Sequence, residues 1–324
     1  MVTAGRISLL YFRVGTFFLL KNNYLAESTQ VFTPQRYLPA TVTCDFMKNL
    51  QIILLLCFCL SAKCQDANTS KKINVLFIGN SLTYYHDMPQ MLQEMLNESK
   101  MNFSIEQSTF PGFSLANHLT DIVIAKTENE ISTRKKEVIE LTETEQKLTS
   151  KKWDIIILQT GGVSVLIPEN RQLKISKTIS DIKKLLPLSG CKVILFETWP
   201  GVNIYPLEYC YPSKTIDQNL TKEQCCSPVI ESLDHEYKLL KQAYDTLAAQ
   251  HNLIKSANGE KFIKILSDYP EITIYEDDIH PNLNGAFLNA CIFYQLLTNQ
   301  KSSNLKYNGN LDPALAKKLK VLSE

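Results

Sequence analysis

Short apolar runs alternate with segments of helical spacing along most of the chain. Five runs predict β-strands, at residues 73–78, 103–106, 154–158, 192–196 and 253–255. Continuous apolar runs of this length are typical of strands buried on both faces of a parallel sheet. Between them, residues 88–96 and 229–249 place their apolar side chains on one face of a helix. This alternation predicts an α/β fold, in which helices cover both faces of a mostly parallel five-stranded sheet.

Two stretches interrupt the alternation. Residues 126–152 are rich in Glu, Lys and Thr, which predicts a solvated helical insertion. Residues 200–228 hold three tyrosines and three cysteines in a long irregular excursion, and loops of that length are uncommon unless they are functional. We therefore expect the excursion to form a wall of the substrate site. No internal repeat is visible, so residues 73–324 are expected to form a single domain.

Residues 47–64 have the three parts of an export signal. Lys48 supplies the positive charge, residues 52–60 form the apolar segment, and Ala62 and Cys64 are small residues at positions that precede a cleavage site. The apolar segment is shorter than the roughly 20 residues that span a bilayer. We therefore expect cleavage directly after Cys64 and a periplasmic or extracellular protein with no membrane span.

The position of this signal predicts that translation starts at Met47. Residues 1–46 are then an upstream extension of the reading frame, and a polar spacer at residues 65–72 leads into the domain. The alternative is that residues 7–20 are themselves a signal or a membrane anchor, although Arg13 interrupts them.

The composition narrows the classes of function. With 44% apolar residues and 34 basic against 33 acidic side chains, the chain is not of the disordered class, which has low hydrophobicity and a large net charge. A net charge of +1 gives no general basic field, so nucleic acid is not an expected partner. Removal of the leader takes away six basic and two acidic side chains, which leaves a net charge of −3. Nothing in the sequence predicts the oligomeric state.

Five of the nine cysteines follow the predicted cleavage site. In an exported protein, Cys210 is expected to form a disulfide with either Cys225 or Cys226, since these residues bracket a short polar stretch. Cys191 and Cys291 stand in apolar contexts that favour burial. No Cys or His pair has the spacing of metal ligands, so no metal site is expected.

Ser81 directly follows the first predicted strand, in the sequence Gly-Asn-Ser-Leu. In open α/β sheets, ligands bind beyond the carboxyl ends of the strands. A serine at such a position is held by rigid structure with backbone N–H groups nearby, which makes Ser81 a candidate nucleophile. The alternative role for this serine is that of a helix cap.

A serine nucleophile needs a base, and the chain has five histidines. Three lie in amphipathic helical stretches: His118, His235 and His251. His86 follows two tyrosines close to Ser81 and is a candidate for lining a pocket. His280 lies three residues after Asp277, whose carboxylate can turn back to one ring nitrogen and leave the other facing a serine. The alternative is a solvent-exposed turn with an incidental histidine.

Together these residues resemble the SGNH, or GDSL-type, hydrolase family. Gly79–Leu82 is similar to the first block of the family, which implies that Ser81 is the nucleophile. Gly112, in Phe-Pro-Gly-Phe-Ser-Leu, is similar to the glycine of the second block, whose N–H helps to form the oxyanion hole with that of Ser81. Asp277 and His280 match the last block, which supplies the other two members of a catalytic triad.

The resemblance covers about residues 73–298 and implies a three-layer, flavodoxin-like α/β/α sandwich. It also implies that His280, oriented by Asp277, takes the proton of Ser81 as the serine attacks an ester carbonyl. Water then frees the acyl group, and no metal or organic cofactor is implied. With the export signal, the resemblance favours an O-acyl ester, such as an acetyl ester, on a carbohydrate.

The third block departs from the pattern of the family. Where the family has Gly-x-Asn-Asp, with the Asn side chain as an oxyanion donor, this sequence has Leu-Gln-Thr-Gly-Gly at residues 158–162. One branch of the family carries Trp-Asp, an apolar strand and Leu-Gln, much like residues 153–159, which implies Gln159 as the substitute donor. That branch also has a Thr-Trp pair similar to the one at Trp199. Trp199 and Asn80 are therefore candidates for the substrate pocket, with core packing as the alternative for the tryptophan.

The sequence thus favours an exported serine esterase, and two other functions stay open. The missing Asn motivates a non-catalytic carbohydrate-binding protein on the same scaffold. An O-acyltransferase, in which a sugar hydroxyl replaces water as the acceptor, is the other alternative.

Overall fold

Five parallel strands form the central sheet, and each begins within one residue of an apolar run that predicts it. They are β1 (Ile73–Gly79), β2 (Phe103–Thr109), β5 (Ile155–Gln159), β6 (Lys192–Phe196) and β9 (Ile254–Lys255). Their order is β2-β1-β5-β6-β9, and every neighbouring pair is parallel. Counted within this sheet alone, the order is 2-1-3-4-5, which is the flavodoxin-like arrangement. The prediction of a parallel five-stranded sheet is confirmed.

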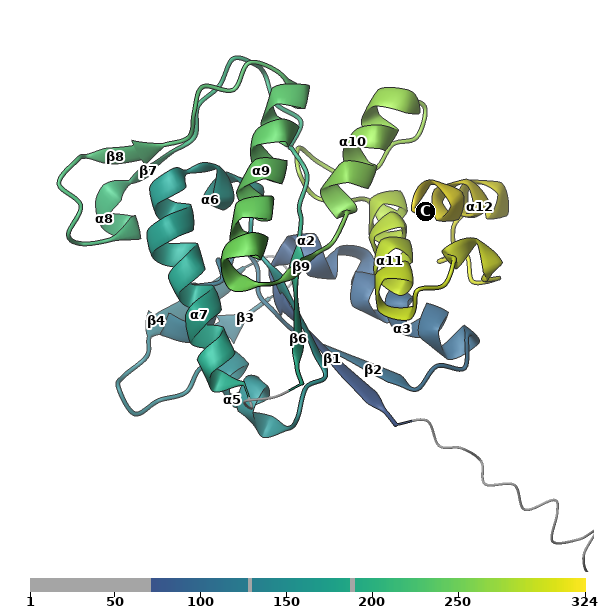
Figure 1. The fold of residues 1–324 in the computed structure, drawn as a ribbon, viewed down its shortest axis with the longest axis horizontal. Coiled ribbons are helices and arrows are strands. Elements are labelled where there is room, and N and C mark those ends of the chain that lie inside the picture. The colour runs from purple at the N-terminus through teal and green to yellow at the C-terminus, as the bar shows by residue number, and fades with distance from the viewer. Residues whose placement is uncertain (1–70, 128–129, 187–189) are drawn as a thin grey trace, which may run out of the picture. The chain divides into compact units, whose positions relative to one another are not determined.

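Helices cover both faces of the sheet, as Figure 1 shows. One face packs against α3 (Met88–Glu98), α10 (Asn258–Asp268), α11 (Leu283–Thr298) and α12 (Pro313–Leu322); the other packs against α5 (Glu143–Ser150), α6 (Gly162–Leu166), α7 (Ser176–Leu185) and α9 (Leu233–His251). Side chains alternate along a strand, so Val75 and Phe77 of β1 join the first set while Leu76 and Ile78 join the second. The predicted three-layer architecture is therefore confirmed.

The computed structural model describes residues 71–127, 130–186 and 190–324. The predicted extension, export signal and cleavage site lie outside these residues. Among the helices of the described ranges, none combines the length and the apolar character that crossing a bilayer requires. Short helical turns complete this part of the chain: α2 (Ser81–Tyr84), η1 (Tyr85–Asp87), α4 (Asn117–Thr120), η2 (Asn170–Ile175) and η3 (Ser302–Asn304).

The helix α11 anchors the preceding loop, residues 275–281, to the sheet. Phe293 of α11 packs edge to face on Phe77 of β1 and Phe196 of β6, with ring centroids 5.2 and 4.8 Å away. Full burial of an aromatic side chain of this kind contributes about 1.5–3 kcal/mol. The side chain of Asn282 caps the helix by accepting two N–H groups of its first turn. The loop that carries Asp277 and His280 is thus fixed by the helix that follows it.

The predicted helical insertion at residues 126–152 is wrong in its first half. β3 (Asp121–Lys126) and β4 (Ile131–Lys135) form an antiparallel hairpin there, and α5 follows. Residues 122–124 of β3 (Ile-Val-Ile) and Ile131 and Thr133 of β4 are β-branched, and such residues favour strands over helices. The high charge of the segment masks this signal in the sequence. The second half is helical as predicted, and it starts with a capping box formed by Thr142 and Glu145.

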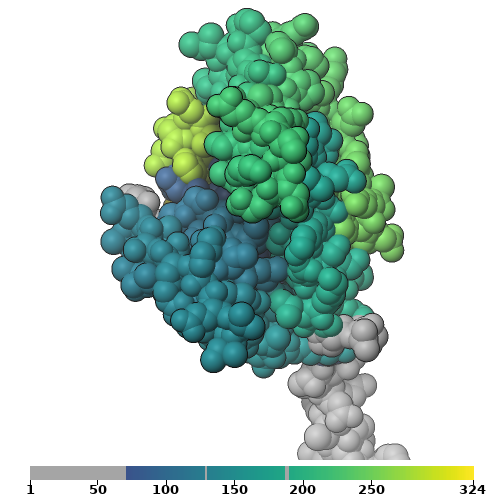
Figure 2. All heavy atoms as spheres, turned by 90° about the vertical axis from the view of Figure 1, so that its left-hand side faces the viewer, coloured from purple at the N-terminus to yellow at the C-terminus, as the bar shows by residue number. Residues whose placement is uncertain are grey.

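The excursion of residues 200–228 holds a small hairpin closed by a disulfide. Its elements are β7 (Cys210–Pro212), α8 (Ser213–Ile216) and β8 (Gln224–Cys226). The antiparallel register sets Cys210 opposite Cys226, and these two cysteines form the disulfide. Cys225 points to the other face of β8 and is buried as a free thiol in a small apolar cluster. Figure 2 shows this green excursion standing above the blue and teal segments of the chain.

Candidate active site

Ser81 lies at the carboxyl end of β1, where the chain turns into α2. The strand ends at Gly79, and the helix begins at Ser81. Asn80 caps the helix, because its Oδ1 accepts the N–H of Leu82 at 3.1 Å. The cap is therefore not Ser81, whose Oγ instead lies 2.8 Å from Nε2 of His280.

Asp277 holds the other nitrogen of the same imidazole. Its Oδ2 lies 2.7 Å from Nδ1 of His280, and its Oδ1 accepts the backbone N–H groups of Ile279 at 2.9 Å and His280 at 2.7 Å. Burial raises the pKa of Asp277, but the two N–H groups and the imidazole outweigh burial and lower this pKa to about 2. The ionised carboxylate favours the Nδ1–H tautomer, which leaves Nε2 to accept the proton of Ser81.

Tyr85 stacks on the ring of His280. The two ring centroids are 4.2 Å apart, and the planes differ by 10°. A stacked neighbour restricts rotation of the imidazole and so helps to keep Nε2 directed at Ser81. Tyr85 is not among the predicted site residues, although its place four residues after Ser81, beside a second tyrosine, is a signal in the sequence.

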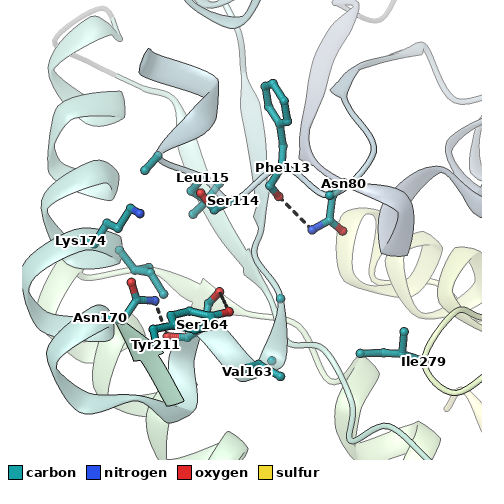
Figure 3. A pocket seen from close by; sticks show the side chains of 15 residues that line it. Asn80, Phe113, Ser114, Leu115, Val163, Ser164, Asn170, Lys174, Tyr211 and Ile279 are labelled. Atoms are coloured by element: carbon teal, nitrogen blue, oxygen red, sulfur yellow. Dashed lines mark hydrogen bonds between the residues drawn. The ribbon is translucent and has the colours of Figure 1, made fainter. Parts of the chain in front are cut away.

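A cavity of about 250 Å³ adjoins these residues, and Figure 3 shows it from close by. Asn80 and Ile279, which precede Ser81 and His280 in the chain, both line it. Its wall is completed by the loop around Gly112, the turn after β5, the η2 segment and Tyr211 of the excursion. Tyr211 therefore brings the excursion into the wall of the cavity. The sequence singled out the excursion, but not which of its tyrosines reaches the cavity.

Gly112 and Ser81 are the two residues whose backbone N–H groups are predicted to hold the oxyanion, and both lie at the cavity: Gly112 lines it, and Ser81 follows Asn80, which also lines it. Gly112 lines the cavity with φ +65°, in the left-handed region that favours glycine, and a Cβ there would meet no atom within 4 Å. Ser81 is the first residue of α2, a position whose N–H has no partner inside the helix. The side-chain amide of Asn80 donates to the carbonyl of Phe113 at 2.9 Å, which ties the two loops together (Figure 3).

Gln159, which is predicted to donate to the oxyanion, does not line the cavity. Gln159 is fully buried beneath the turn after β1, with no exposure to the cavity. Its Oε1 accepts the backbone N–H of Asn80 at 2.7 Å and the hydroxyl of Thr83 at 3.1 Å. β5 pairs with β1, so a side chain at the end of β5 reaches under the neighbouring turn. Gly79 leaves room for it, since a Cβ there would lie 2.5 Å from Oε1 of Gln159.

The sequence leaves two alternatives for Trp199, the substrate pocket and core packing, and the structure shows core packing. Trp199 is 1% exposed, and its indole stacks on Phe262 of α10 with centroids 3.7 Å apart. Its Nε1 donates to the carbonyl of Ile279 at 3.0 Å. The core-packing alternative therefore applies, and the tryptophan supports the loop that carries His280.

His86 does not line the cavity as predicted. Its Nε2 lies 2.5 Å from Oε2 of Glu276, on the loop that also carries His280. His86 and Asp87 both have positive φ values, 49° and 54°, where the chain kinks between α2 and α3. This left-handed kink turns the imidazole of His86 toward Glu276 and away from the cavity wall.

His118 supports the nucleophile from inside the protein. It is buried, with Nε2 3.0 Å from the carbonyl oxygen of Gly79 and Nδ1 2.8 Å from Oγ1 of Thr144. Burial lowers the pKa of His118 to about 4, although the bond to Gly79 acts in the opposite direction. The ring is therefore neutral at pH 7, and it donates from Nε2 because a carbonyl can only accept. A helical pattern alone does not reveal this role.

The sequence matches no protein-family model and no curated protein. Among solved structures, the chain is similar to a DUF4886 family protein from Bacteroides uniformis, with a TM-score of 0.58 and 18% identity, covering 78% of this chain and 93% of that one. At this identity the similarity shows a shared fold.

Matches with lower scores include structures described as SGNH hydrolases or esterases. One is a protein from Slackia heliotrinireducens provisionally described as an SGNH hydrolase, with a TM-score of 0.46 and 19% identity, covering 70% of this chain and 100% of that one. Another is a variant of an acetyl-xylooligosaccharide esterase from Geobacillus stearothermophilus, with a TM-score of 0.40 and 14% identity, covering 70% and 94%.

Proposed function

We propose that this chain is an exported serine esterase of the SGNH type that hydrolyses an O-acyl ester, with Ser81 as the nucleophile. One observation carries the proposal: an unbroken series of contacts joins Ser81 to His280 at 2.8 Å and His280 to Asp277 at 2.7 Å, next to a cavity at the carboxyl end of the sheet. A buried serine cap or an incidental surface histidine would not require this geometry.

The mechanism follows from these positions. His280 takes the proton of Ser81 as the hydroxyl attacks the ester carbonyl, and the ionised Asp277 stabilises the imidazolium. The N–H groups of Ser81 and Gly112 hold the oxyanion. His280 then passes the proton to the leaving alcohol, and water attacks the acyl-enzyme by the same steps in reverse.

The proposed oxyanion hole has two donors on this chain, because Gln159 is buried beneath the turn and does not line the cavity. Loss of one donor in a comparable hydrolase costs about 10²- to 10³-fold in kcat. We therefore expect a slow esterase on simple aryl esters. The missing Asn is also what motivates the non-catalytic alternative, so a direct test of turnover is needed.

Two features support export and an extracellular ester. The predicted export signal at residues 47–64 precedes the domain, and the Cys210–Cys226 disulfide is of a kind that persists in oxidising compartments. Carbohydrates are the expected carriers of O-acyl groups for such an enzyme, with acetyl as the first acyl group to test.

The test is to incubate the purified domain with an aryl acetate and, separately, with a serine-directed fluorophosphonate. We expect hydrolysis of the ester and labelling at Ser81, both abolished in Ser81→Ala. Ser180→Ala, on α7, is the matched control and should behave as wild type. No turnover and no label in wild type would overturn the esterase in favour of the binding protein. Product that forms only when a sugar acceptor is added would identify an acyltransferase.

A further inference from the structure

The cavity beside the proposed triad has a single charged side chain in its wall. Among the described residues that line it, Lys174 is the only acidic or basic residue. Lys174 belongs to η2, the π-helical segment that leads into α7. Figure 3 shows its ammonium directed toward the cavity from the side opposite Asn80 and Ile279. The charge therefore lies across the cavity from Asn80 and Ile279, the residues that directly precede Ser81 and His280 in the chain.

The charge of Lys174 has no carboxylate partner. Its Nζ donates to the carbonyl of Thr215 at 2.9 Å, and in the described part of the chain no Asp or Glu forms an ion pair with it. Asp121 acts on it only from a distance and is already paired with Lys135. Lys174 is half-buried, and burial lowers its pKa. A partly desolvated cation with one neutral partner is a favourable site for an anion.

Neutral donors flank the ammonium on the same side of the cavity. Ser164 and Tyr211 both line the cavity, and their hydroxyl oxygens lie 3.4 Å apart. The amide of Asn170 is committed to the carbonyl of Ser164 at 2.7 Å, which holds this corner in place (Figure 3). Hydroxyl groups can donate to an anion as well as accept. One ammonium and two hydroxyls match a group with a single negative charge and several acceptor lone pairs.

We propose that this corner, formed by Lys174, Ser164 and Tyr211, binds a carboxylate of the substrate, so that the enzyme acts on O-acyl esters of acidic sugars. The proposal rests on the esterase function proposed above. The cavity volume of about 250 Å³ lies just below the usual range of about 300–1,000 Å³ for ligand pockets, so it fits one ring-sized group. A single acidic sugar ring can then place its carboxylate at Lys174 and its ester at Ser81.

The test compares two esters that differ only in charge: an acetylated methyl glucuronoside and the acetylated methyl glucoside with acetyl at the same position. For wild type we expect kcat/KM to favour the acid by about 10- to 100-fold, the range for hydrogen bonds to a charged group. Lys174→Met keeps the length of the side chain and removes the charge, so the ratio should fall to near one. Because the ratio is measured within each variant, a general change in activity cancels.

Lys177→Met is the matched control, since Lys177 is an exposed lysine of α7 that pairs with Asp181. This variant should keep the wild-type ratio. A ratio near one in wild type, or a ratio that Lys174→Met leaves unchanged, would overturn the proposal. In the second case Lys174 serves only to anchor Thr215, and Lys174→Met would lower kcat/KM for both esters by the same factor.

A binding measurement separates this proposal from the esterase itself. In Ser81→Ala, calorimetry should show methyl glucuronoside binding at least about tenfold more tightly than methyl glucoside, and Lys174→Met in the same background should abolish the difference. If wild type hydrolyses aryl acetate but this preference is absent, only the carboxylate site is wrong. If wild type neither hydrolyses aryl acetate nor is labelled at Ser81, the esterase is wrong, and the binding ratio alone decides whether the corner recognises an anion.

Discussion

Two histidine–carboxylate pairs lie near Ser81, and they are built differently. In one, Asp277 contacts Nδ1 of His280 at 2.7 Å, and Nε2 of the same ring faces Ser81 at 2.8 Å. In the other, Glu276 contacts Nε2 of His86 at 2.5 Å. The first carboxylate comes from the same turn as its histidine, and the second comes from a residue 190 positions away.

The two pairs differ in which ring nitrogen the carboxylate occupies, and this determines whether the imidazole is suitable as a base. Asp277 is held by two backbone N–H groups of its own turn, so that it can reach only the near nitrogen of the ring and leaves the far one for Ser81. Glu276 takes the far nitrogen of His86 itself. A carboxylate beside an imidazole therefore defines a base only when it occupies the nitrogen that points away from the nucleophile.

The largest effect is expected from removing each imidazole in turn. His280→Ala should lower kcat/KM for an aryl acetate by about 10⁴- to 10⁶-fold, because among the described side chains only His280 is hydrogen-bonded to the hydroxyl of Ser81. His86→Ala should lower kcat/KM by less than about tenfold, since its imidazole contacts Glu276 of the loop and does not take the proton of Ser81. Steady-state kinetics on both variants checks this, with circular dichroism as a control for folding. Equal losses would identify His86 as the base.

The next effect comes from the two carboxylates. Asp277→Asn should lower kcat by about 10⁴-fold, because an amide that donates to Nδ1 favours the wrong tautomer. Glu276→Gln keeps a polar contact to His86 and should cost less than about tenfold. Measured kcat values for the two variants decide between the pairs. A larger loss from Glu276→Gln than from Asp277→Asn would reverse the assignment.

Features that depend on local pattern could be predicted from the sequence. Each strand could be predicted because it is an apolar run ended by a glycine or a polar residue. A parallel arrangement of the strands could be predicted because helices separate these runs. Ser81 was visible because it directly follows such a run. The link between Asp277 and His280 spans three residues of one turn, so spacing alone indicates that the side chains can meet.

Features that depend on distant packing could not be predicted in this way. Gln159 and Trp199 were expected at the site, because each matches a residue of the family branch that the sequence resembles. Which way such a side chain points is decided by the neighbouring strand or helix, which places Gln159 under the Asn80 turn and Trp199 against Phe262. Lys174 reaches the cavity from a helical segment whose sequence shows only a charged face.

The smallest expected effect concerns stability, through a third histidine that has no carboxylate partner. His118 is buried and neutral against the carbonyl of Gly79, with its pKa lowered to about 4 from 6.5. Between these values the unfolded chain binds a proton that the folded protein does not, so the free energy of unfolding falls as the pH drops from about 6.5 to about 4. The free energy of unfolding falls by about 3 kcal/mol in total, since each unit of pKa shift corresponds to about 1.36 kcal/mol. Above pH 6.5, His118 makes no pH-dependent contribution to stability.

His118→Gln tests this directly, because glutamine can still donate to Gly79 but does not titrate. Urea unfolding at pH 7.0, 5.5 and 4.5 should show that wild type loses stability faster than the variant over this window. Asp277 does not contribute there, since its pKa of about 2 means that its stabilising effect is lost only as the pH falls from about 3.8 toward 2. The same pH dependence in both proteins would mean that the imidazole of His118 takes up a proton in the folded state. His118 would then become protonated in the folded protein, as an exposed histidine such as His86 can, and its burial would not set it apart from His86 and His280.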